Sequence, residues 1–275
     1  MKKLLLFASV LMSTTVMLSA QQTETLKQKE EVKKEVKTKN KNNGSDNWNN
    51  WNNWGNGERI RGEGPSVTET RDVRNFRGFK SGISADITLK QTSGSYNVSV
   101  DGQKNIIALL KFDVVDGILK IGFEKGYSVN YKEPLKITIE APSFEYMGMS
   151  GSGDVRTKGA ISGEKLTISI SGSGDFDLDN LKYGNMSVGI SGSGDVDLSG
   201  SVESVDLSIS GSGDVNAENL KAQKASCRVS GSGDISLNVT KELDASVSGS
   251  GDIRYLGNPP SVRTRVSGSG DIKSR

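Results

Sequence analysis

The chain has 275 residues, with 35 Lys and Arg against 33 Asp and Glu, which gives a formal net charge of +2. This balance holds no basic surplus of the kind that nucleic-acid binding requires. Histidine, the commonest general base and metal ligand at neutral pH, is absent, and the single cysteine, Cys227, excludes an internal disulfide framework.

The N-terminus has the features of a secretory signal peptide. A lysine pair precedes an apolar run at residues 4–18, and the small residues Ser19 and Ala20 follow it. The pattern predicts residues 1–20 as a cleaved signal peptide, since the alternative, a membrane anchor, needs about 18 or more apolar residues. We therefore expect an exported protein, either periplasmic or at the cell surface or extracellular, with no transmembrane segment in the mature chain.

Residues 21–63 predict a tether. Its first half is dominated by Lys, Glu, Gln and Thr, and its second half is rich in Asn and Gly, with Trp48, Trp51 and Trp54 at intervals of three. Such a composition buries too little apolar surface to form a core. The tryptophans leave a second interpretation open, a segment that contacts sugar rings or a membrane-facing surface.

Residues 64–149 predict an irregular β cap. The only helix candidate, residues 105–111, is short, and a cap is expected because the end of a stacked β-structure must shield its open edge. Alternating apolar and polar residues predict strands at 87–89, 97–100, 112–115, 118–123 and 135–139.

Residues 150–275 contain seven copies of Ser-Gly-Ser-Gly-Asp, 18 to 21 residues apart. A fixed period of this size is typical of stacked structural units. Residues 83–89 resemble an eighth, decayed copy in which Ala85 replaces a glycine. The aspartates of the seven copies are Asp154, Asp175, Asp195, Asp214, Asp234, Asp252 and Asp271.

Apolar residues alternate on both sides of each copy. Ile168 and Ile170 precede the second copy, and Phe176 and Leu178 follow it. This period of two indicates strands with one buried face, and it places the glycines inward at a corner and the serines and aspartate outward. Each repeat is expected to form two short strands around the corner and then a polar turn, such as residues 162–164 or 257–260.

These patterns predict an all-β fold, a parallel β-helix or β-solenoid of about seven coils of ~20 residues with an irregular N-terminal cap. A β-propeller is the alternative, but its blades need ~40 residues. Cys227 occupies an inward column that is filled elsewhere by Ile, Val, Leu or Ala, so we expect a buried thiol.

Several of these features together resemble a known family. They are the signal peptide, the repeats and three strand-like segments, residues 76–83, 113–121 and 135–142. The chain resembles, over about residues 64–275, the family described as putative auto-transporter adhesin, head GIN domain, a domain of unknown function. The resemblance implies an exported β-helical domain of Gram-negative bacteria, and it brings no catalytic residues.

The outward serines and aspartates form a candidate binding stripe. Strands lie ~4.8 Å apart, and unpaired carboxylates at that spacing repel by ~0.9 kcal/mol in water. Three interpretations are open: the aspartates accept bonds from Ser hydroxyls or backbone N–H groups, they bind cations between coils, or they dock a ligand of matching period. One carboxylate per coil offers too few oxygens for calcium. The stripe comprises the seven aspartates named above with Ser173, Ser193, Ser212 and Ser232.

No catalytic site, cofactor or metal site is expected. A glycosidase needs two carboxylates in unequal surroundings, whereas these recur as near-identical copies. The sequence predicts an exported, non-catalytic β-solenoid that presents a polar Ser/Asp surface in adhesion, binding or cell-envelope structure. The alternative is a periplasmic glycan-active or scaffold protein. The partner is unknown, with a glycan or another cell-surface ligand as the candidates.

Overall fold

The structure is a computed structural model that describes residues 27, 30, 31 and 58–275. The predicted signal peptide and most of the predicted tether lie outside these residues and stay predictions. No helix among the described residues is long and apolar enough to cross a membrane.

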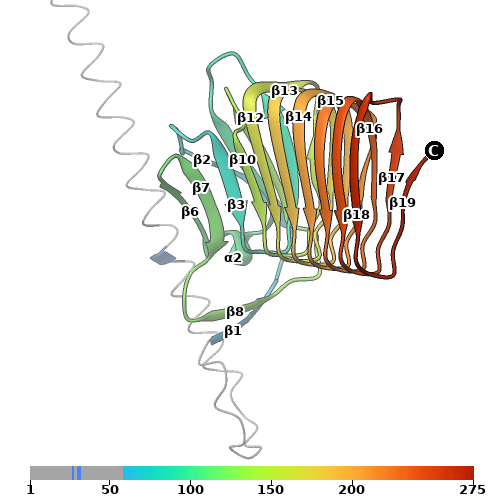
Figure 1. The fold of residues 1–275 in the computed structure, drawn as a ribbon. Helices are drawn as coiled ribbons and strands as arrows, with labels where there is room; N and C mark the ends of the chain where they lie inside the picture. Colours follow the sequence, from blue (N-terminus) through green and yellow to red (C-terminus); the bar gives the residue numbers. More distant parts are fainter. Residues whose placement is uncertain (1–26, 28–29, 32–57) are drawn as a thin grey trace, which may run out of the picture.

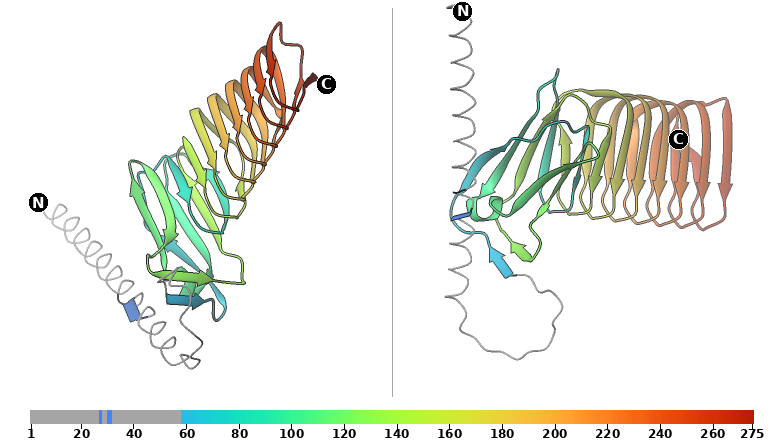
Figure 2. Two further views of the ribbon diagram at one scale, coloured as in Figure 1. Left: turned by 60° about the horizontal axis from the view of Figure 1, so that its bottom comes forward. Right: turned by 90° about the vertical axis from the view of Figure 1, so that its left-hand side faces the viewer.

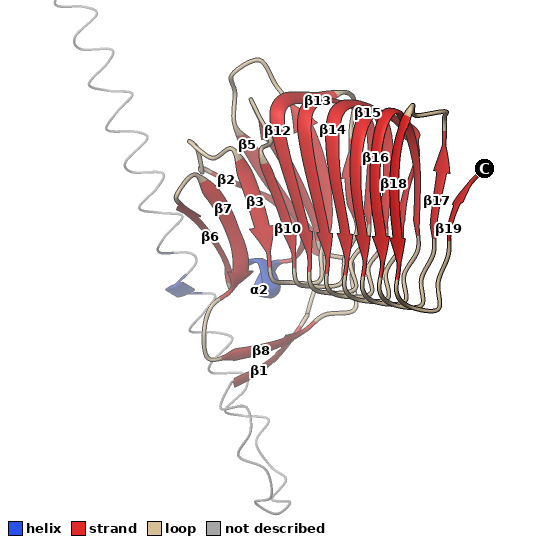
Figure 3. Ribbon diagram, viewed as in Figure 1, coloured by secondary structure: helices blue, strands red, loops and turns tan. Residues whose placement is uncertain are grey.

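The described chain is almost entirely β-structure (Figure 1; Figure 3 colours the strands). The N-terminal part contains β1 (Glu58–Arg61), β2 (Ser66–Arg71), β3 (Gly78–Ser81), β4 (Asp86–Gln91), β5 (Asn97–Gln103), α2 (Lys104–Ile107), β6 (Leu110–Val115), β7 (Ile118–Phe123), β8 (Tyr127–Asn130) and β9 (Lys136–Ala141). The repeats contain β10 (Tyr146–Met149), β11 (Val155–Thr157), β12 (Ile161–Ile170), β13 (Phe176–Ile190), β14 (Val196–Ile209), β15 (Val215–Val229), β16 (Ile235–Val247), β17 (Ile253–Leu256), β18 (Ser261–Val266) and β19 (Ile272–Ser274).

The repeats wind into stacked parallel coils, as Figure 2 shows from two further sides. Strands one repeat apart pair in parallel, so that the residue after each motif aspartate lies beside its counterpart: Phe176 pairs with Val196, Val196 with Val215, and Val215 with Ile235. The predicted β-solenoid is therefore confirmed.

One continuous core runs through the stack. The inward column before the motif contains Ile168, Val188, Leu207, Cys227 and Ala245, and all five side chains are buried. Because a single coil could not cover these apolar residues, their removal from water stabilises the stack rather than the individual repeat.

The predicted polar turn at residues 162–164 is wrong. These residues lie inside β12, where Ser162 pairs with Lys182 of the next coil, and Ile161 beside them is buried. The backbone keeps its coil-to-coil hydrogen bonds through the bend, so polar side chains here mark an outward face of the wall. The turn predicted at residues 257–260 does separate β17 from β18.

The cap continues the solenoid with a change of strand direction. Strands β7 and β9 pair in parallel with β3 and β4, whereas β6, β5 and β2 add on in antiparallel orientation. The five strands predicted here are confirmed, with ends shifted by a few residues at most. The helix candidate is a single turn, α2, and β6 begins at Leu110. Strand β1, which pairs with β8, precedes residue 64, where the sequence pattern placed the start of the folded part.

The glycine corner is held by close approach between coils. A Cβ at Gly192 would lie 1.9 Å from the carbonyl oxygen of Gly172, and one at Gly231 would lie 1.9 Å from that of Gly211. The motif glycines are not among the residues with positive φ. Glycine is therefore required because the next backbone occupies the space of a side chain, not because of a left-handed conformation.

The decayed first copy obeys the same rule. Ile83 and Ala85 occupy the two glycine positions of that copy, since Gly151 and Gly153 stack directly on their carbonyl oxygens. Both side chains are tolerated because the chain below them leaves the coil path between β7 and β9 and forms β8 instead of a glycine corner.

Replacing one corner glycine should destabilise the fold much more than replacing an outward glycine of the same coil. Gly192→Ala forces a methyl group into a carbonyl oxygen and should cost roughly 1–3 kcal/mol or more. Gly189→Ala, whose Cβ meets nothing within 4 Å, should stay within about 0.5 kcal/mol of the parent. Urea unfolding measures both, and equal stabilities would contradict the stacking argument.

The thiol of Cys227 should react slowly in the folded protein. Burial, with the nearby charge of Asp206 as a lesser cause, raises the pKa of this thiol to about 12, so almost no thiolate is present at neutral pH. Labelling with a thiol reagent should be complete within minutes in denaturant and should lag far behind without it. Equally fast labelling in both conditions would show that the column is open.

Candidate binding surface

The aspartates of the predicted stripe lie in one file, and hydrogen bonds join those from Asp175 to Asp271. The backbone N–H of Asp195 donates to Oδ1 of Asp175 at 2.8 Å. The bond recurs from Asp214 to Asp195 at 2.8 Å, from Asp234 to Asp214 at 2.7 Å, from Asp252 to Asp234 at 2.7 Å and from Asp271 to Asp252 at 2.9 Å. We call this file the aspartate ladder. It corresponds to the first of the three interpretations, with backbone N–H groups as the donors.

The ladder has a structural cause in the corner itself. The N–H of Phe176 donates across to the carbonyl of Asp195 in the next coil at 2.9 Å, so the backbone pairing changes direction at the aspartate. The N–H of Asp195 bonds to a side chain instead of a backbone carbonyl. A short side chain with an acceptor oxygen is needed at this position, and aspartate supplies a charge-assisted one.

Cations neutralise both ends of the ladder. Arg156 binds Asp154 at 2.8 Å, Arg254 binds Asp234 at 3.0 Å and Asp252 at 2.7 Å, and Lys273 binds Asp271 at 2.7 Å. The hydrogen bond that Arg254 donates to Asp234 is the main cause that raises the pKa of Arg254, and the one that Lys273 donates to Asp271 does the same for Lys273. The terminal carboxylates are thus engaged within the protein.

The middle of the ladder is acidic and open. Oδ2 of Asp175, Asp195 and Asp214 makes no hydrogen bond or ion pair with the residues that the structure describes. Asp177 and Asp197 are exposed beside them, and Asp197 accepts a bond from the Asn216 side chain at 2.8 Å. We call this group the central carboxylate patch; its members are Asp175, Asp177, Asp195, Asp197 and Asp214.

The two serines of each motif differ in role. In the motifs of Ser150, Ser191, Ser210 and Ser230, the hydroxyl of the first serine donates to a backbone carbonyl of the preceding coil, as from Ser191 to Ile170 at 3.4 Å. The second serine is exposed, and its hydroxyl is not bonded to the described part of the chain in the coils of Ser173, Ser193, Ser212 and Ser232. The structure therefore brings the four candidate serines together with the central aspartates on one solvent-facing surface.

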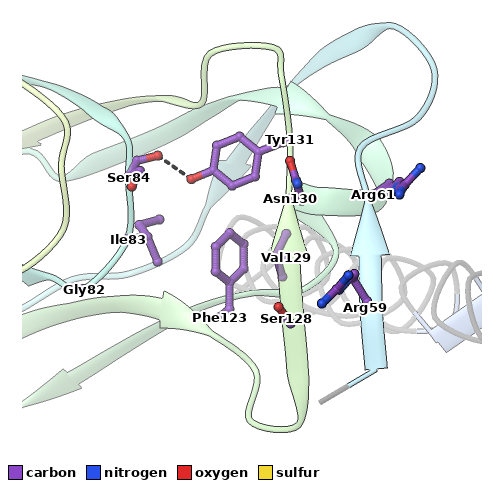
Figure 4. A pocket seen from close by; sticks show the side chains of 10 residues that line it. All are labelled: Arg59, Arg61, Gly82, Ile83, Ser84, Phe123, Ser128, Val129, Asn130 and Tyr131. Carbon is purple, nitrogen blue, oxygen red and sulfur yellow. Dashed lines mark hydrogen bonds between the residues drawn. The ribbon is translucent and has the colours of Figure 1, made fainter. Parts of the chain in front are cut away.

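A hollow that the sequence did not predict lies beside the first corner (Figure 4). It has a volume of about 590 Å³ and lies between β8 and residues 82–84. Tyr131 crosses it, donating a hydrogen bond to the carbonyl of Ser84, and burial raises the pKa of Tyr131. The contact joins residues that are 47 positions apart, so no local pattern could have revealed it.

The central carboxylate patch lacks the geometry of a metal centre. Among the described residues, no three or more Asp, Glu or Cys side chains are grouped so that they could hold a metal ion. The carboxylates stand one per coil along a wall, and the surface offers hydroxyl and carboxylate oxygens to a ligand that lies across several coils.

Comparisons with known proteins agree with this architecture. The chain is 30% identical to a putative adhesin from Bacteroides fragilis, over 78% of this chain and 100% of that one, with a TM-score of 0.76. It is 26% identical to a putative lipid binding protein from Parabacteroides distasonis, over 79% and 99% of the two chains, with a TM-score of 0.66. A putative adhesin from the same species, at 24% identity and a TM-score of 0.65, shares the fold. No curated protein matches the chain.

The family model gives the same result as the solved structures. It matches residues 75–259, which include β3 to β17 and six of the corner motifs with their flanking strands in full. The chain therefore belongs to the family described as putative auto-transporter adhesin, head GIN domain.

Proposed function

We propose that this protein is an exported, non-catalytic adhesin that binds a glycan-bearing cell-surface ligand across its central carboxylate patch. The observation that carries the proposal is the free Oδ2 of Asp175, Asp195 and Asp214 beside a row of exposed serine hydroxyls. Membership of an adhesin family supports a role in adhesion or binding.

The chemistry of the patch suits a hydroxyl-rich polymer. Carboxylate oxygens accept hydrogen bonds from sugar hydroxyls, and serine hydroxyls both donate and accept them. The oxygens recur at the strand spacing of ~4.8 Å, so one extended chain can contact several coils at once. Weak contacts repeated in this way add up through effective concentration.

The proposal that the protein is not an enzyme rests on the sameness of the coils. The ladder carboxylates from Asp175 to Asp252 each accept the N–H of the next aspartate. An acid and base pair needs environments that separate the two pKa values, and a repeated environment does not provide them. Export is supported by the predicted signal peptide at residues 1–20 and stays part of the proposal.

Neutralising the central patch should strongly weaken glycan binding without unfolding the protein. In the triple variant Asp175→Asn, Asp195→Asn, Asp214→Asn, each amide oxygen still accepts the ladder hydrogen bond while the charge is lost. We expect the parent chain to bind members of a glycan array and the triple variant to bind them at least roughly tenfold more weakly.

The matched control is the pair Asp206→Asn, Asp244→Asn, which removes outward charges from a different wall of the stack. It should bind like the parent. A triple variant that binds as tightly as the parent, or an array with no bound glycan, would contradict the proposal. Vesicles form a second arm, because one relative is described as a putative lipid binding protein. New reducing ends in the bound glycan would instead indicate a glycan-active enzyme.

A further inference from the structure

The most exposed large apolar side chains of the described chain lie on two edge strands. Val114 and Val115 on β6 are 37% and 40% exposed, and Val262 and Val266 on β18 are 41% and 47% exposed. Within the described chain, β6 pairs only with β7, and β18 pairs only with β16. Figure 1 places β6 and β18 at opposite ends of the stack.

Three of these valines, Val114, Val262 and Val266, are core residues that lack one neighbouring coil, whereas Val115 lies on the outward face of β6. Val262 and Val266 pair with the buried Leu243 and Val247, and so continue two inward columns. Val114 pairs with the buried Leu119 and continues an inward column at the other end. Another strand laid along either edge would bury them, and it would also pair the open backbone groups of that edge.

The two edges carry complementary charge. On β18 the outward side chains are Arg263 and Arg265, and both are exposed. Arg263 forms a loose ion pair with Glu242, with 3.9 Å between the charged atoms. On β6 the outward side chains are Lys111, Asp113 and Val115, and Asp116 follows in the turn, so this edge carries one net negative charge. The basic C-terminal edge thus matches a carboxylate, Asp113, at the centre of the N-terminal edge.

Two identical C-terminal edges do not fit each other. An antiparallel pair of β18 strands centred on Thr264 would set Arg263 of one copy directly opposite Arg265 of the other, at two places. Like charges at directly opposed positions destabilise a strand pair. The symmetric dimer is therefore disfavoured by the sequence of β18 itself.

We propose that copies of this chain associate head to tail, with β18 of one copy pairing antiparallel with β6 of the next. A register that sets Arg265 opposite Asp113 also sets Val266 opposite Phe112 and Thr264 opposite Val114, so apolar residues meet on the inner face. Because the two surfaces differ, the contact does not close on itself and generates a row of copies. This inference does not rest on the proposed ligand.

The test uses a blocked head, Val114→Lys, and a blocked tail, Val266→Lys, in the full chain. A lysine on an edge strand opposes further strand addition. In sedimentation velocity, the parent should form species larger than a monomer as its concentration rises, and each variant alone should weaken this association by roughly tenfold or more. The control Ser169→Lys, exposed in the middle of the stack, should associate like the parent.

Mixing the two blocked variants gives the decisive result. The blocked head keeps an intact tail and the blocked tail keeps an intact head, so an equimolar mixture should form a dimer and stop there. Arg265→Asp should weaken the association of the parent, and adding Asp113→Arg to the same chain should restore it.

Three outcomes would overturn the inference. The first is a parent chain that stays monomeric at all concentrations. The second is a blocked-head variant that associates as strongly as the parent, which a tail-to-tail contact would allow. The third is a mixture of the two blocked variants that stays monomeric. Unchanged melting temperatures of the variants would show that the result concerns the edges rather than folding.

Discussion

The structure depends on the approach of one glycine corner to the next. The carbonyl oxygen of Gly172 occupies the position that a Cβ of Gly192 would take. This close approach sets each coil directly above the previous one, in one register. That register places aspartate above aspartate, so the N–H of Asp195 reaches Oδ1 of Asp175, and it places each inward isoleucine or valine in a continuous column. The ladder and the core are thus two consequences of one steric constraint.

The first coil shows what happens where the constraint ends. Below Ile83 and Ala85 there is no glycine corner, because the chain departs between β7 and β9, and side chains return to the two inward sites. The space is completed by β8 and Tyr131, which leaves a hollow instead of a packed corner. At the other end of the solenoid nothing in the described chain covers Val262 and Val266, so the two ends of one repeat array differ in shape and in chemistry.

The period and the parity of the repeats were enough to predict the stack, its inward columns and the buried Cys227. They were not enough for the wall between corners: the polar residues at 162–164 read locally as a turn, but Ser162 pairs with Lys182 of the next coil and the strand continues. The candidate aspartates and serines do share one surface, as their parity required. Which of them remain open was not predictable, because it depends on cations such as Arg254, which contacts Asp234 20 positions away along the chain.

Since stacking fixes the motif, differences in surface charge between coils must come from residues outside the motif. The outward residue two positions after each motif aspartate illustrates this: it is Arg156, Asp177, Asp197, Asn216, Ser236, Arg254 and Lys273 along the stack. Where this residue is a cation, its side chain forms an ion pair with a ladder aspartate and neutralises that carboxylate. Where it is an aspartate, it adds a second carboxylate to the coil. A scaffold that repeats five residues unchanged can still vary its charge from coil to coil, and the central acidic patch forms where this variable column adds carboxylates to the motif aspartates or leaves them without a cation.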